Sequence, residues 1–138
     1  MSVIRHMRIN NPAVGADVAE TIPAGVVWEI RGFACHYTPD ANAGNRYLYV
    51  TIFRPGLFPG GIIYFAVMTT ALVASTIKFN SMSPTQSTPA VARWEATHSG
   101  AIARIPMMAG DIFSVSALNK KAGDFMDAVN LQVEEYKL

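Results

Sequence analysis

The side chains that most often carry out chemistry in proteins are few in this sequence and lie far apart. The histidines are His6, His36 and His98, and no two of them have the spacing of a metal-binding pair. No His-x-His pair followed by a glutamate occurs either. We therefore expect no metal site and no cofactor, and interpret the histidines as hydrogen-bonded or exposed side chains.

The acidic residues and the cysteine do not suggest catalysis. Asp40 and Asp124 lie in turn-like segments, where an aspartate commonly accepts hydrogen bonds from its own backbone. Cys35 lies in an alternating strand pattern, which is typical of a small buried hydrophobe. The sequence contains neither a nucleophile elbow nor a phosphate loop. We expect that the protein is not an enzyme, with a carboxylate pair assembled only in space as the open alternative. The other acidic residues considered for such a pair are Glu29, Asp111, Asp127, Glu134 and Glu135.

Aromatic residues are the better candidates for binding. Tyr47, Tyr49 and Phe53 alternate along one side of a single strand pattern, and the tryptophans are Trp28 and Trp94. Core packing is the favoured interpretation of these residues. The alternative is an aromatic platform for sugar rings or a partner protein, formed by Tyr47, Tyr49 and Trp94.

Two further pairs of residues are candidate contacts with another subunit or with a larger assembly. Leu57 and Phe58 lie in a loop at 55–61 that has no alternating pattern to place them in the protein's own core. We therefore expect them to insert into a neighbouring subunit. Arg5 and Arg8 lie within residues 1–16, which form either an N-terminal arm that reaches an acidic surface or an edge strand.

Composition favours a protein that is partly covered by copies of itself or by a partner. Charged residues make up 15% of the 138 residues, against about 25% in a typical soluble domain. The net charge of +1 argues against nucleic-acid binding. The first residues show no secretory leader, and the longest low-charge stretch, 56–77, is broken by Pro59, Gly60 and Gly61, so no membrane helix is expected.

Alternation with period two is the main pattern of the chain. In 125–136, Val129, Leu131 and Val133 alternate with polar residues, as in a strand that has one face on a core and one in water. Only 90–97 could form a single helical turn. The sequence therefore predicts an antiparallel, jelly-roll-like all-β sandwich, with residues 1–138 as a single domain. Strands are expected at 3–9, 17–22, 26–37, 46–54, 62–68, 72–79, 101–105, 111–118 and 125–136.

Details of the pattern predict topology. Between Arg46 and Arg54 the strand has no charge on either side, which predicts a central strand covered on both faces. The phase of alternation shifts at Gly32, which predicts a bulge. Proline-to-glycine turns at 23–25 and 106–110 predict equivalent corners. We also expect strands 62–68 and 72–79 to pair, and loops at 39–45, 55–61 and 81–89.

Several of these segments resemble a known group of proteins. They are IPAGVVWEI at 22–30, DANAGNR at 40–46, IPMMAGDIFSV at 105–115 and the Gly-Asp at 123–124. Over residues 22–133 the chain is similar to small structural proteins of tailed bacteriophages, of the jelly-roll capsid decoration (cement) type. The shared motifs are turn signatures, and the resemblance implies no catalytic residues.

The resemblance implies a virion structural protein, assembled in the host cytoplasm, that binds the major capsid protein on the outer shell. Such a protein stabilises the shell through many weak contacts, as a homo-oligomer such as a trimer. It implies neither a nucleic-acid partner nor a membrane. The alternative function is a carbohydrate- or receptor-binding module of a phage fibre or tail.

Overall fold

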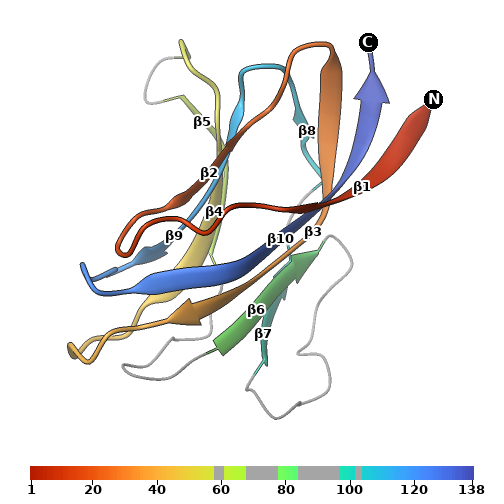
Figure 1. The fold of residues 1–138 in the computed structure, drawn as a ribbon. Coiled ribbons are helices and arrows are strands. Elements are labelled where there is room, and N and C mark those ends of the chain that lie inside the picture. The colour runs from red at the N-terminus through yellow and green to blue at the C-terminus, as the bar shows by residue number, and fades with distance from the viewer. Residues whose placement is uncertain (58–60, 68–77, 84–96, 102–103) are drawn as a thin grey trace.

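The computed structural model describes residues 1–57, 61–67, 78–83, 97–101 and 104–138, and these form two stacked sheets (Figure 1). The six-stranded sheet has the order β1-β10-β3-β6-β7, with β8 paired to β3, and the four-stranded sheet has the order β2-β9-β4-β5. The predicted all-β sandwich is therefore confirmed. The strands are β1 (Ser2–Arg8), β2 (Val18–Thr21), β3 (Val26–Thr38), β4 (Tyr47–Phe53), β5 (Ile62–Val67), β6 (Lys78–Ser83), β7 (Thr97–Ala101), β8 (Pro106–Met107), β9 (Ile112–Leu118) and β10 (Phe125–Lys137).

The pairing has the order of a jelly roll. Each outgoing strand pairs with a returning one: β1 with β10, β2 with β9, β3 with β6 and β4 with β5. The doubled ribbon then folds so that β10 also pairs with β3, and β9 with β4. This arrangement closes two antiparallel sheets on each other. The short strand β8 and the parallel strand β7 are additions to it.

The core lies between the inward faces of the two sheets. Leu48, Val50 and Ile52 of β4 are fully buried, and their neighbours in sequence are only partly buried. The same alternation buries Val129, Leu131 and Val133 of β10, as the sequence predicted. Burying one such aliphatic side chain contributes about 1.5–3 kcal/mol, so these alternating residues hold the sheets together.

A bulge lies at the predicted place in β3. Gln132 pairs with Gly32 and the next residue, Val133, pairs with Ile30, so that Arg31 is the extra residue on β3. Because one residue is left over, the alternation changes phase and the apolar side chains before and after it all face the core. These side chains are Trp28, Ile30, Phe33, Cys35 and Tyr37.

The two proline-to-glycine corners meet at one end of the sandwich. Gly25 has φ of 80° and Gly110 has φ of 86°, values that glycine adopts without strain. The amide of Gly110 donates to the carbonyl of Ile22, and the amide of Ile22 donates to the carbonyl of Asp111. The predicted corners are therefore confirmed, and they are hydrogen-bonded neighbours.

Two predictions about strands are wrong in part. Strand β4 is central in its sheet, between β9 and β5, but only one of its faces is covered, because Tyr47 and Tyr49 lie half-buried on the outside. The strands at 62–68 and 72–79 do not pair where the structure describes them. Strand β5 joins β4, whereas residues 78 and 79 belong to β6, which joins β3 in the other sheet. Residues 68 and 72–77 lie outside the described residues.

The region 81–105 differs from expectation where it is described. Residues 81–83 end strand β6 and do not begin a loop, and Ala101 ends strand β7 where a strand at 101–105 was expected to begin. Pro106 and Met107 form β8 because they pair with Glu29 and Trp28, a pairing that the turn signature at 106–110 does not reveal. The expected loop over 84–89 and the expected helical turn at 90–96 lie outside the described residues.

Candidate functional site: an uncharged outer sheet face

The outer face of the four-stranded sheet carries no charged side chain at its strand positions. Strand register places these residues beside one another, opposite the core-facing residues of the same strands. We call this surface the uncharged face. It consists of Ala19 and Thr21 of β2, Ile112, Ser114, Ser116 and Leu118 of β9, Tyr47, Tyr49, Thr51 and Phe53 of β4, and Ile62, Phe65 and Val67 of β5.

Large apolar side chains of this face are open to solvent. Ile62 is 59% exposed, Phe65 50% and Leu118 42%. With a rise of about 3.3 Å per residue and about 4.8 Å between strands, the face spans about 23 Å by 19 Å, or about 440 Å². This area includes the threonine, serine and tyrosine side chains of the face, among which exposed aromatic and aliphatic side chains gather, as they often do at interaction sites.

The uncharged face is hollowed near its centre. A cavity of about 520 Å³ is bordered by Tyr49, Phe53, Phe65, Ile112 and Leu118, among others, and reaches Thr51 and Ser114. Asp17, which precedes β2, lies at its margin and is ion-paired with Lys120. The Tyr49 and Phe65 rings lie with their centroids 5.2 Å apart at 38°, a favourable tilted contact that fixes both rings. The hollow therefore has ordered aromatic walls.

The outer face of the six-stranded sheet is different. Arg31 is paired with Glu134, and Arg104 lies 3.1 Å from Glu29 and 3.8 Å from Glu134. Farther along the same face, His36 lies 3.4 Å from Asp127. We call this surface the charged face. Paired, hydrated charges of this kind tolerate water as their neighbour and contribute little to stability.

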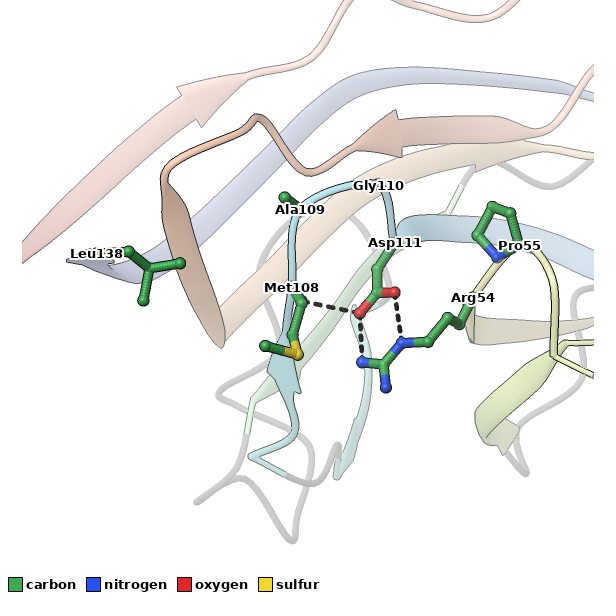
Figure 2. Close-up of a pocket in the computed structure, with 7 residues that line it drawn as sticks. All are labelled: Arg54, Pro55, Met108, Ala109, Gly110, Asp111 and Leu138. Carbon is green, nitrogen blue, oxygen red and sulfur yellow. Dashed lines mark hydrogen bonds and ion pairs between the residues drawn. The ribbon is translucent and has the colours of Figure 1, made fainter.

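A second pocket lies beside the corners (Figure 2). Arg54 donates from Nε and Nη2 to the two carboxylate oxygens of Asp111, both at 2.8 Å, and the amide of Met108 donates to the same carboxylate. The Arg54 hydrogen bond lowers the pKa of Asp111, an effect that burial opposes and the Met108 amide supports. Asp111 is thus ionised, and its hydrogen bonds to Arg54 and to the Met108 amide stabilise the corner.

The opposite end of the sandwich holds a buried ion network around Arg46, which is 0% exposed. Nε and Nη2 of Arg46 donate to Asp124 at 3.0 Å each, and Nη2 also donates to Asp40 at 2.6 Å. Nη1 donates to the carbonyls of Asn42 and Gly44. All five N–H groups of the guanidinium can be satisfied in this way, as burial of an arginine requires.

The electrostatics of this network make it structural. Burial alone would raise the pKa of Asp124, but hydrogen bonds from Arg46, two backbone amides and Tyr37 outweigh it and lower the pKa to about 2. Burial and the hydrogen bond to Asp124 raise the pKa of Tyr37. Asp40 and Asp124 do meet in space, as the open alternative of a carboxylate pair required. They share Arg46, however, and Asp124 holds no proton near neutral pH that a general acid could give.

The predicted contact residues lie in separate places. Arg5 and Arg8 belong to β1, which is an edge strand and not a free arm, and Arg5 reaches the buried Glu135 at 2.8 Å. Leu57 is 47% exposed in its loop, as expected, and Phe58 lies outside the described residues. The structure therefore does not join Arg5 and Arg8 to Leu57 as one surface.

The structure places only two of the three residues of the predicted aromatic platform. Tyr47 and Tyr49 do share the uncharged face, and Trp94 lies outside the described residues. Sequence reasoning missed Ile62, Phe65 and Leu118, which alternation assigned to strands without assigning them a face. The signal that points to them is the lack of charge on both sides of β4, which was interpreted as coverage by the protein's own chain.

The described part of the chain holds no cluster of three or more histidine, cysteine or acidic side chains that could bind a metal ion. Burial, and to a lesser extent the charge of Asp127, raises the pKa of Cys35 to about 12, so this thiol is unreactive near neutral pH. Among the described residues, no helix has the length and apolar character that a membrane span requires. Comparison of the chain with protein families, curated proteins and solved structures finds no significant match.

Proposed function

We propose that the protein is a binding and assembly protein, a virion structural protein of the capsid decoration type, and not an enzyme. The observation that carries this proposal is the uncharged face, an outward-facing apolar surface on a four-stranded sheet. Residues that face water on a solvated sheet are usually polar, as on the charged face of this same sandwich. An apolar outer face therefore favours a protein that works in contact with neighbours.

The size of the face fits an assembly of many copies. A contact of at most about 440 Å² per partner is about half of what a stable pairwise complex buries. A single such contact is weak, but copies held on a repeating shell are at high effective concentration, and their contacts add. In this mechanism many copies adhere across the joints between major capsid protein subunits, and contacts between neighbouring copies through the uncharged face add to that adhesion.

The direct experiment is binding to expanded capsid shells of the encoding phage that lack this protein. We expect the full chain to co-sediment with the shells and to raise the temperature at which they disassemble, because a ligand that binds only the assembled state stabilises it. Absence of co-sedimentation at every salt concentration between about 0.02 and 0.5 M would contradict the proposal, since screening alone would not remove an apolar contact.

A carbohydrate- or receptor-binding module is the second candidate, favoured by the ring pair of Tyr49 and Phe65 beside the hydroxyls of Thr51 and Ser114. Aromatic rings can stack on sugar rings, and the hydroxyls can hydrogen-bond to them. Most of the remaining wall is aliphatic, however, and would strip water from sugar hydroxyls without replacing it. A glycan array would test this function: binding that Tyr49→Ala abolishes would support it, and no signal would count against it.

A further inference from the structure

The uncharged face has one row in which a large side chain stands beside small ones. Register aligns Ala19 of β2 with Ser114 of β9, Ser114 with Thr51 of β4, and Thr51 with Phe65 of β5. The next row along the strands, in contrast, contains the bulky Ile112, Phe53 and Ile62. The small residues therefore form the floor of the hollow, and Phe65 stands at one side of it.

Phe65 is half exposed, and its ring is supported on one side. Its ring rests against Tyr49, and strand β5 is held by its pairing with β4 from Tyr49 to Phe53. Aromatic side chains contribute strongly to interfaces because they bury a large area at a small loss of conformational freedom. An aromatic ring that is already fixed loses even less on binding, so Phe65 has the properties of an anchor residue.

We propose that the occupant of the uncharged face is a second copy of this chain, with Phe65 of each copy seated in the other's hollow over Thr51 and Ser114. The proposal rests on the proposed function, which makes the protein an assembly protein, and it names the self-contact. The contact is isologous: the same two features meet twice around a two-fold axis.

The strand arrangement permits this symmetry. A two-fold axis that runs along the strands, close to β4, turns one face over onto the other. Rotation about this axis leaves each row at the same position along the strand direction, and it places the β5 side of one copy opposite the β9 side of the other. Phe65 of one copy then lies above Thr51 and Ser114 of the other, because all three belong to one row. Sheets stacked face to face lie about 10 Å apart, a distance that interdigitating side chains fill.

The charge distribution permits a second copy as the occupant of the uncharged face. Identical surfaces that stack face to face bring like charges together unless the surface has none, and the uncharged face has none at its strand positions. Asp17 at the margin is already paired with Lys120. The charged face in the same arrangement would bring Glu134 and Arg104 near their own copies, which desolvates ion pairs that water now solvates.

The test is the solution mass of the full chain by light scattering and sedimentation equilibrium, over a range from about ten micromolar to one millimolar, because a face of this size gives weak association. We expect the wild-type mass to rise towards that of a dimer. Two variants should weaken the association about tenfold or more. Phe65→Ser removes the ring, and Ser114→Trp fills the hollow and leaves Phe65 in place. Ile4→Ser is the matched control, since Ile4 is 48% exposed on β1 and should associate as the wild type does.

A mixture of the two variants tests the geometry itself. The Ser114→Trp chain keeps a ring and lacks a hollow, whereas the Phe65→Ser chain keeps a hollow and lacks a ring. One of the two contacts can therefore re-form between unlike chains, and the mixture should associate more tightly than either variant alone. All of the substituted side chains are partly or largely exposed, and circular dichroism checks that each variant is folded.

Three outcomes would overturn the self-contact: a wild-type chain that stays monomeric at the highest concentration, variants that associate as the wild type does, or a mixture that gains nothing. The shell experiment separates this failure from failure of the proposed function. If Phe65→Ser and the wild type are both monomers and both co-sediment with shells, the self-contact is wrong and the proposed function stands. A glycan that binds a monomeric wild type but neither variant would assign the hollow to a sugar, which also overturns the self-contact.

Discussion

The two outer faces of this sandwich are built from the same kind of strand, and they meet solvent differently. On the charged face, Arg31 of β3 is ion-paired with Glu134 of β10, and Arg104 pairs with Glu29 of β3 and lies near Glu134. On the uncharged face, Thr51, Ser114 and Phe65 occupy equivalent outward positions on β4, β9 and β5. The inward faces of both sheets are alike, because both pack on one core. In the six-stranded sheet, alternation separates residues that face the core from residues that face water. In the four-stranded sheet, it separates residues that face the core from an uncharged surface that suits a neighbouring molecule.

Both faces belong to one folded sandwich. Of the substitutions considered, one in the Arg46 network should lower its free energy of unfolding most. Arg46→Met removes the cation that compensates the buried Asp124, so we expect a loss of about 3–5 kcal/mol in the free energy of unfolding. Urea denaturation followed by tryptophan fluorescence and by circular dichroism measures it, and both signals should change together. A loss below about 1 kcal/mol would mean that the Arg46 network contributes little to the stability of the fold.

Acid should weaken the sandwich through the same network. The folded pKa of Asp124 is about 2, below the value of about 3.9 in an unfolded chain. Its contribution is therefore fully present above about pH 4 and is lost as the pH falls towards 2, by about 2 kcal/mol in total. Urea midpoints between pH 5 and pH 2 measure this loss. Asp124→Asn is less stable at neutral pH but should show a shallower fall in this window, and an equal slope in both proteins would contradict the assignment.

The charged face should be tolerant of substitution. Arg104 is 46% exposed and pairs with Glu29 and Glu134, so Arg104→Gln should change the free energy of unfolding by at most about 1 kcal/mol. It should also leave the solution mass unchanged, because the charged face takes no part in the proposed self-contact. If this variant altered the mass as strongly as Phe65→Ser, the distinction between the two faces would be lost.

Salt concentration should have the smallest effect of all on the proposed self-association. Association through the uncharged face buries no charge at its strand positions, and Asp17 at the margin is already paired with Lys120, so the dissociation constant should change less than about threefold between 0.05 and 0.5 M sodium chloride. A contact made by the charged face would weaken markedly over the same range. Sedimentation equilibrium at both salt concentrations distinguishes the two faces without any substitution.

Much of the fold follows from local patterns in the sequence. Period-two alternation identified β4, β9 and β10 because each strand has one face on the core, and the prolines and glycines marked both corners. The bulge in β3 was visible as a phase shift at Gly32. The pairing of β5 with β4 in one sheet, and of β6 with β3 in the other, was not visible, because strand propensity identifies a strand without selecting its partner.

Local sequence was enough to show that this chain forms strands, that its corners need glycine, and that neither side of β4 carries charge. Which side of β4 faces the core depends on the folded chain, because alternation separates two faces without stating what covers each. The tertiary structure also brought Arg46 to Asp124, 78 residues away, and set Phe65 beside Thr51 and Ser114. Contacts between distant segments depend on strand register and sheet stacking, which are properties of the whole chain. The uncharged face and its hollow exist only once the jelly roll has closed.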